Sequence, residues 1–150
     1  MNNKTVKELF NELHDIIPGY VSHTDSSDII IIDETHNVGF EIFENEIIVF
    51  FFSAHTHFEN YSDKNNSEYI SRAKEFLNKL FTCTIKHEKI FKGKTLTEER
   101  YTFINKDNTD DCPIYVCNKL LPRFIPFLSK HTYAKLYKYN SVQKTFTEMT

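Results

Sequence analysis

The stretch from Glu46 to Phe58 is the feature that most constrains how this chain can fold. It is rich in Ile, Val and Phe, which favour strands because branched and aromatic side chains pack well on a pleated surface. Its apolar run, Ile47 to Phe52, is far shorter than the roughly 20 residues of a membrane-spanning helix. We therefore expect one long strand, central in its sheet and covered on both faces over its first half.

Beyond Ser53 the two faces of this strand differ. Successive side chains point to opposite sides of a strand, so His55, His57 and Glu59 share one face. The other face stays apolar as far as Phe58, and we expect the polar face to lose its cover and lie open. Two imidazoles and a carboxylate at this spacing suit a metal ion or histidine acid–base catalysis. A small metal- or histidine-dependent hydrolase or ribonuclease is therefore one interpretation.

Periodicity predicts the remaining elements. A 3.6-residue spacing of apolar positions predicts amphipathic helices over residues 4–17 and 67–81. Strand-forming residues bounded by turn residues predict further strands, at residues 29–32, 38–43, 82–92 and 95–105. The last two are expected to form a hairpin around Gly93. In the tail, residues 113–116 are expected to be extended. Pro126 is expected to open a last helix, and the segment LSKHTYAKLYKYN is interpreted as an amphipathic closing helix.

These elements define the expected fold class. Their order is α-β-β-β-α-β-β with a C-terminal helical tail, so the strands come in blocks and do not alternate strictly with helices. This order favours an α+β fold, with a mainly antiparallel five-stranded sheet and helices packed on it. At 150 residues and 17.8 kDa, the chain is expected to form a single domain over residues 1–150.

The sequence lacks the motifs that mark several common classes of enzyme. The chain has no phosphate-loop, dinucleotide-binding, HExxH or GxSxG motif, so we expect no cofactor and lean against an enzyme. Cys112 and Cys117 have a zinc-like spacing, but no second pair completes a site, so we expect no bound metal there. Three cysteines, with no signal peptide or membrane segment, indicate reduced thiols in a cytoplasmic protein without a membrane partner.

Charge is distributed unevenly along the chain. Residues 1–63 hold two Lys against twelve Asp and Glu, whereas residues 118–150 hold six basic residues and one acid. The tail interleaves lysines with tyrosines, a pattern that suits single-stranded nucleic acid. The net charge of −3 argues against that partner. The acids crowd the first three strands and their turns, where their field attracts a basic protein.

In size, charge and layout, the whole chain resembles bacterial immunity proteins of contact-dependent inhibition and polymorphic toxin systems. The resemblance implies a non-catalytic inhibitor that binds a cognate toxin and neutralises it by covering the active site. The toxin is expected to be a basic nuclease. The residues expected to bind it are Asp33, Glu34, Glu41, Glu44, Glu46, His55, His57, Phe58, Glu59 and Tyr61.

Overall fold

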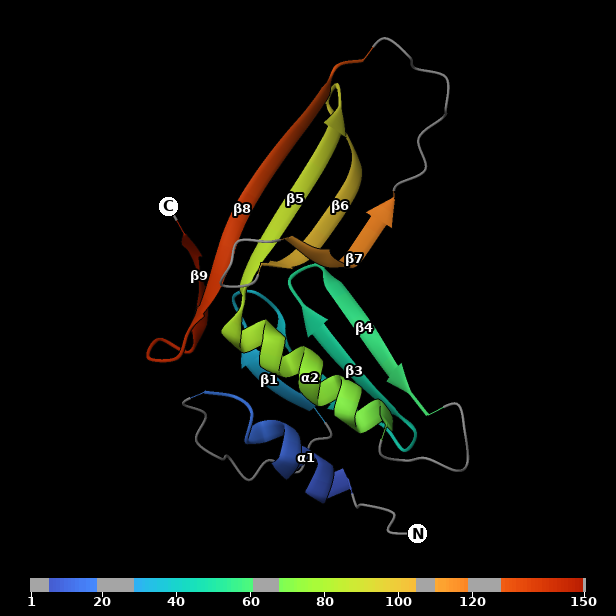
Figure 1. Cartoon of the computed structure of the whole chain (residues 1–150), viewed down its shortest axis with the longest axis vertical. Helices are drawn as coiled ribbons and strands as arrows, with labels where there is room; N and C mark the ends of the chain where they lie inside the picture. The colour runs from blue at the N-terminus through green and yellow to red at the C-terminus, as the bar shows by residue number, and fades with distance from the viewer. Residues whose placement is uncertain (1–5, 19–28, 61–67, 105–109, 119–127, 150) are drawn as a thin grey trace. The chain divides into compact units, whose positions relative to one another are not determined.

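The computed structural model describes residues 6–18, 29–60, 68–104, 110–118 and 128–149. These ranges contain two helices and nine strands, and the chain divides into two compact units (Figure 1). Unit 1 comprises residues 1–82 and 139–146, and unit 2 comprises residues 83–138 and 147–150. Neither described helix is both long enough and apolar enough to cross a membrane. The single domain expected over residues 1–150 stays a prediction.

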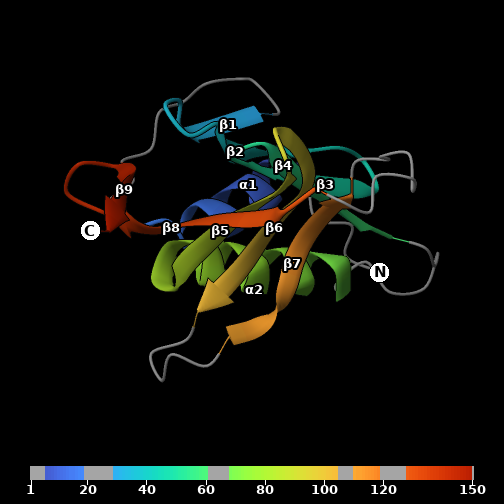
Figure 2. The same ribbon diagram turned by 90° about the horizontal axis from the view of Figure 1, so that it is seen from above.

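Unit 1 is a four-stranded antiparallel sheet with two helices packed on one face (Figure 2). The helices are α1 (Val6–His14) and α2 (Glu68–Thr82), close to the predicted ranges. Neighbouring strands are joined by short turns, so the four strands lie in the sheet in chain order. They are β1 (Ile29–Asp33), β2 (Val38–Ile42), β3 (Glu46–Phe51) and β4 (Ala54–Glu59).

The core of unit 1 lies between the sheet and the helices, because each of these elements is apolar on one side. Every second residue of β3, beginning with Ile47, is fully buried. Phe51 and Phe58 lie on neighbouring strands, and both pack on the ring of Phe76 in α2, at centroid distances of 5.4 and 5.6 Å. The helices add to this core Leu9, Leu13, Tyr69, Ile70, Ala73, Leu77, Leu80 and Phe81.

The single long strand predicted over residues 46–58 is wrong, because the chain reverses at Phe52 and Ser53. β3 ends just before these two residues, and β4 begins just after them. Phe52 has a φ of 53°, in the left-handed region where Gly, Asn and Asp are the usual residues. The turn therefore lacks the Gly, Asn or Asp that marks a two-residue hairpin in a sequence.

The reversal changes which side chains share a face. In the predicted strand, Ile47 and Val49 lie on the same side as His57. In the structure they are buried under the helices, and His57 instead lies opposite Ile48 on the other side of the sheet. The polar face is therefore not the exposed end of a long strand whose first half is buried on both sides. It is the face of the sheet opposite α1 and α2.

Unit 2 is built on a long hairpin. As predicted, β5 (Thr84–Lys92) and β6 (Thr95–Ile104) pair around Gly93, whose φ of 58° suits a glycine. β7 (Asp110–Asn118) pairs with β6, which confirms the extended segment at 113–116. β8 (Lys130–Asn140) pairs with the other edge of β5, and β9 (Thr145–Met149) follows β8. The sheet order is β7-β6-β5-β8-β9.

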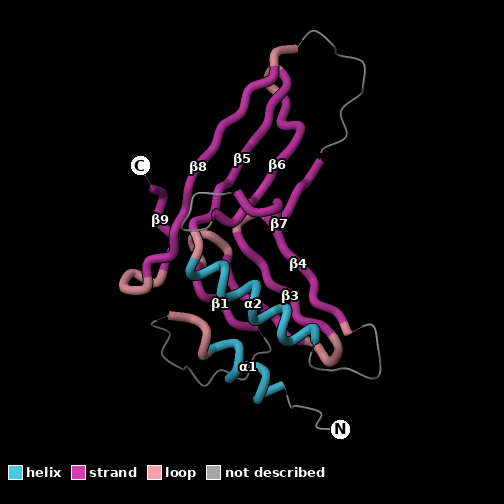
Figure 3. The backbone as a smooth tube through the Cα atoms, in the orientation of Figure 1, coloured by secondary structure: helices cyan, strands magenta, loops and turns pink. Residues whose placement is uncertain are grey.

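The α+β class and the antiparallel pairing are confirmed, but two other expectations are wrong. Sheets of four and five strands replace the single five-stranded sheet. The segment LSKHTYAKLYKYN contains β8 and not a closing helix, and β9 follows it (Figure 3). Pro126, expected to open a last helix, lies outside the described residues.

Asp33, at the end of β1, is a buried carboxylate that holds the tip of the β8–β9 hairpin within unit 1. It is only 4% exposed, and its Oδ2 accepts hydrogen bonds from the Phe146 backbone N–H and the Thr145 hydroxyl, both at 2.8 Å. The His36 backbone N–H donates to Oδ1, and the His36 ring Nδ1 lies 2.8 Å from Oδ2. Burial raises the pKa of Asp33, but these hydrogen bonds outweigh it and hold the pKa below the ordinary value.

We expect Asp33→Asn to lower the free energy of unfolding at pH 7 by about 2–3 kcal/mol, because an amide N–H₂ replaces an acceptor among several donors. The folded pKa of Asp33 is lowered, so its stabilisation is present above about pH 4 and is lost as pH falls through the folded pKa. Urea unfolding at pH 7 and pH 3 should therefore show a smaller acid-induced loss in Asp33→Asn than in the wild type. Glu34→Gln, at the next and exposed position, is the control and should match the wild type at both pH values.

Candidate functional site

The face of the unit 1 sheet opposite the helices is the candidate functional site, and we call it the open face. The strand register aligns its side chains in rows that cross the sheet. One row is Ile29, Glu41, Ile48 and His57, the next is Ile31, Gly39, Phe50 and His55, and a last pair is Glu46 and Glu59.

The β1 side of the open face is apolar. Ile29 and Ile31 are 41% and 54% exposed. Beside them, the ring of Phe50 lies over Gly39, where an added Cβ would come within 2.6 Å of the ring and 2.2 Å of the Ile30 carbonyl oxygen. Only glycine fits at this position, so Gly39 allows the aromatic ring to lie across the sheet. Grouped apolar side chains exposed on a surface are a mark of interaction sites.

The charges on the open face have one sign. From Ile29 to Asn60 the sequence has six Asp and Glu and no Lys or Arg. Glu41, Glu46 and Glu59 belong to the open face, and Glu34 and Glu44 are exposed in its turns. Unit 1 as a whole holds seven Lys and Arg against fourteen Asp and Glu, whereas unit 2 holds eleven against seven.

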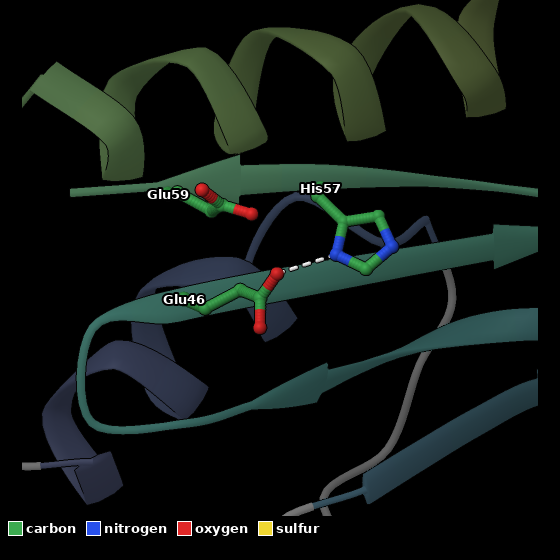
Figure 4. A group of neighbouring side chains, drawn as sticks. All are labelled: Glu46, His57 and Glu59. Atoms are coloured by element: carbon green, nitrogen blue, oxygen red, sulfur yellow. Dashed lines mark hydrogen bonds and ion pairs between the residues drawn. The ribbon is translucent and has the colours of Figure 1, made fainter. Parts of the chain in front are cut away.

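At one end of the open face, Glu46, His57 and Glu59 form a histidine–carboxylate cluster across β3 and β4 (Figure 4). The two glutamates are directly opposite each other in the strand register. The His57 Nδ1 is hydrogen-bonded to the Glu46 carboxylate. One donor atom from each of the three residues lies within 4.8 Å of the other two. The His57 side chain is 43% exposed, so protons and ions in solution reach the cluster.

His55 lies beside this cluster but does not belong to it. Its ring centroid is 5.0 Å from that of His57, in an edge-to-face arrangement. His55, His57 and Glu59 alternate on one side of β4, as predicted, but the group whose donor atoms converge contains Glu46 instead of His55. A single long strand would have kept Glu46 far from Glu59. Only the reversal after Phe51 brings these two carboxylates together.

Two of the predicted partner-binding residues point away from the open face, and one is not described. Asp33 is buried in its hydrogen-bond network. Phe58 is 7% exposed and packs inward on Phe76, with the Arg72 guanidinium 5.8 Å from its ring centroid. Tyr61 lies outside the described residues. The apolar members of the open face could not be identified from the sequence, because the strand pairing decides which side of the sheet they share. They are Ile29, Ile31, Ile48 and Phe50.

Unit 2 contains a second ionisable cluster, which is half-buried. The His87 Nε2 lies 2.7 Å from Glu99 Oε1, and the His87 ring stacks on Tyr101 at a centroid distance of 4.3 Å. Burial lowers the pKa of His87, assisted by Lys89 and Lys135, and the attraction to Glu99 does not fully offset it. These groups pair with one another on the sheet surface, and we assign them no ligand.

No protein-family model, curated protein or solved structure matches the chain. The function of the open face is therefore inferred from its geometry and charge.

The direct opposition of Glu46 and Glu59 predicts a like-charge penalty in the folded protein. In metal-free buffer at low salt, Glu59→Gln should raise the free energy of unfolding by about 0.5 kcal/mol, since like charges directly across two strands destabilise a sheet. The gain should shrink as salt screens the pair. Glu44→Gln makes the same charge change in the exposed β2–β3 turn, outside the cross-strand pair. An equal gain from both variants in denaturant unfolding would contradict the prediction.

Proposed function

We propose that unit 1 binds a basic protein through the open face, and that the chain is an immunity protein that neutralises a cognate toxin. One observation carries the proposal. The same sheet face holds the exposed Ile29 and Ile31 together with carboxylates, and residues 29–60 contain no Lys or Arg. A solvated acidic surface does not need exposed isoleucines, and a purely apolar patch would not gather glutamates. Together they match the mixture of apolar and charged contacts that protein–protein interfaces make.

Each part of this face has a physical task in such a complex. The isoleucines and Phe50 supply apolar surface that is removed from water when a partner docks. Glu34, Glu41 and Glu44 attract a positively charged partner and speed the encounter. The core packs against the helix side of these strands, so the open face is largely formed before binding. This reduces the conformational entropy that is lost on association.

The partner chemistry follows from the sign of the charge. A nuclease must hold phosphates, so its substrate-binding surface is lined by Lys and Arg. An acidic sheet face that covers this surface competes with nucleic acid without any chemistry of its own. We therefore propose a non-catalytic inhibitor that acts in the cytoplasm on a basic nuclease toxin.

The test compares two charge reversals on opposite sides of unit 1. Glu41 lies on the open face, and Glu75 lies on α2 with 68% of its side chain exposed. We expect Glu41→Lys to weaken binding to the proposed cognate toxin domain by roughly tenfold or more, mainly through slower association. Glu75→Lys changes the net charge equally and should leave the affinity near that of the wild type. Association and dissociation rates measured at low and high salt provide the readout.

A third variant, Ile31→Ala, tests the apolar half of the face. It should raise the dissociation rate and leave the salt dependence of association unchanged, because it removes buried surface and no charge. Circular dichroism of each variant checks that it is folded. If the wild-type protein neither binds the toxin domain nor protects growing cells that express it, the proposed function is wrong. Equal losses in Glu41→Lys and Glu75→Lys would show that the open face is not the binding surface.

A further inference from the structure

We infer that Glu46, His57 and Glu59 bind a divalent transition-metal ion of the zinc class on the open face. This inference goes beyond toxin binding and does not depend on it, since all three ligands belong to this chain. It rests on three observations: the donor atoms converge, the two carboxylates lie directly opposite each other, and residues 29–60 contain no Lys or Arg.

The donor atoms are already near the positions that a metal ion requires. Zinc binds imidazole nitrogens and carboxylate oxygens at about 2.0–2.2 Å, so two ligand atoms on a tetrahedral ion lie about 3.4 Å apart. The three donors here lie within 4.8 Å of one another. Small rotations of these exposed or partly exposed side chains would close the difference, and the paired strands β3 and β4 need not move.

The charges of the cluster favour a cation. Glu46 and Glu59 face each other directly in the register, which is unfavourable for two like charges. Glu59 has no ion pair with any described residue, and residues 29–60 contain no Lys or Arg to offset the pair. The His57 ring is hydrogen-bonded to Glu46. A bound dication would compensate both carboxylates and use the imidazole as a ligand.

The mixed donor set selects the class of metal. Imidazole nitrogen suits zinc, copper and nickel, whereas calcium requires six to eight oxygen ligands and magnesium keeps most of its water. Three protein ligands on an exposed surface leave at least one coordination position for water. Zn²⁺ is therefore the appropriate probe, and Ca²⁺ is the probe that should fail to compete with it.

The chain supplies a matched control for the decisive variant. His55 and His57 lie on the same strand and the same face, and both are exposed, but only His57 belongs to the convergent group. His57→Ala and His55→Ala therefore make the same chemical change two residues apart. A nonspecific loss of surface histidine would affect both variants alike, whereas the proposed site requires them to differ.

The experiment titrates Zn²⁺ into the whole, chelator-treated protein without any toxin, in competition with a chromophoric chelator. We expect His57→Ala to weaken the binding of one zinc equivalent by more than the roughly 10–100-fold that loss of an outer-shell partner costs a metal site. Glu59→Gln should also weaken it, and His55→Ala should leave it unchanged. Nuclear magnetic resonance of the imidazole signals should show that zinc shifts His57.

The contrary outcomes are distinct from a failure to bind toxin. If the wild type binds no zinc, or if His57→Ala binds it as tightly as the wild type, the site is overturned. Equal losses in His55→Ala and His57→Ala would overturn this ligand set. Unchanged circular dichroism in both variants excludes misfolding as the cause of a loss.

Discussion

The pairing of β3 with β4 is the constraint on which the rest of unit 1 depends. The two-residue reversal at Phe52 and Ser53 places Glu46 opposite Glu59, with the intervening pairs in register between them. Because strand side chains alternate, the same register buries Ile47, Val49 and Phe51 under the helices and leaves the residues between them on the open face. A slip of one residue would exchange the two sets, which the buried core does not permit.

The acids of this region have different physical roles that their residue type does not reveal. Asp33 has lost its contact with water and is held by N–H and O–H donors, so its charge stabilises the fold. Glu41 and Glu44 remain on the surface, where their charge acts on molecules in solution. Glu46 and Glu59 are forced together by backbone pairing, so their charge is a local cost until a cation offsets it.

The sequence predicted what depends on local periodicity and failed where a turn lacked its usual residues. Both helices and the hairpin at Gly93 follow from apolar spacing and turn chemistry, and the structure confirms them. The hairpin at Phe52 could not be predicted, because a bulky residue there has a positive φ that packing must impose. The tail was ambiguous, since Tyr133 and Tyr137 suit one helix face as well as alternate strand positions. Strand alternation predicts that His55 and His57 share a face, but Glu46 lies beside His57 only because the chain reverses.

The two properties inferred for the open face depend on carboxylates of the same acidic surface, so they cannot be energetically independent. A dication on Glu46 and Glu59 would cancel much of the charge at one end of the face and leave Glu41 and the exposed isoleucines unaltered. Binding linkage is reciprocal: if metal weakens the binding of a basic partner, the partner weakens the binding of metal by the same factor. The metal would strengthen the binding of the partner only if the partner supplies a ligand to the open coordination position. In that case the metal would bridge the two proteins, and the exposure of His57 leaves room for such a ligand.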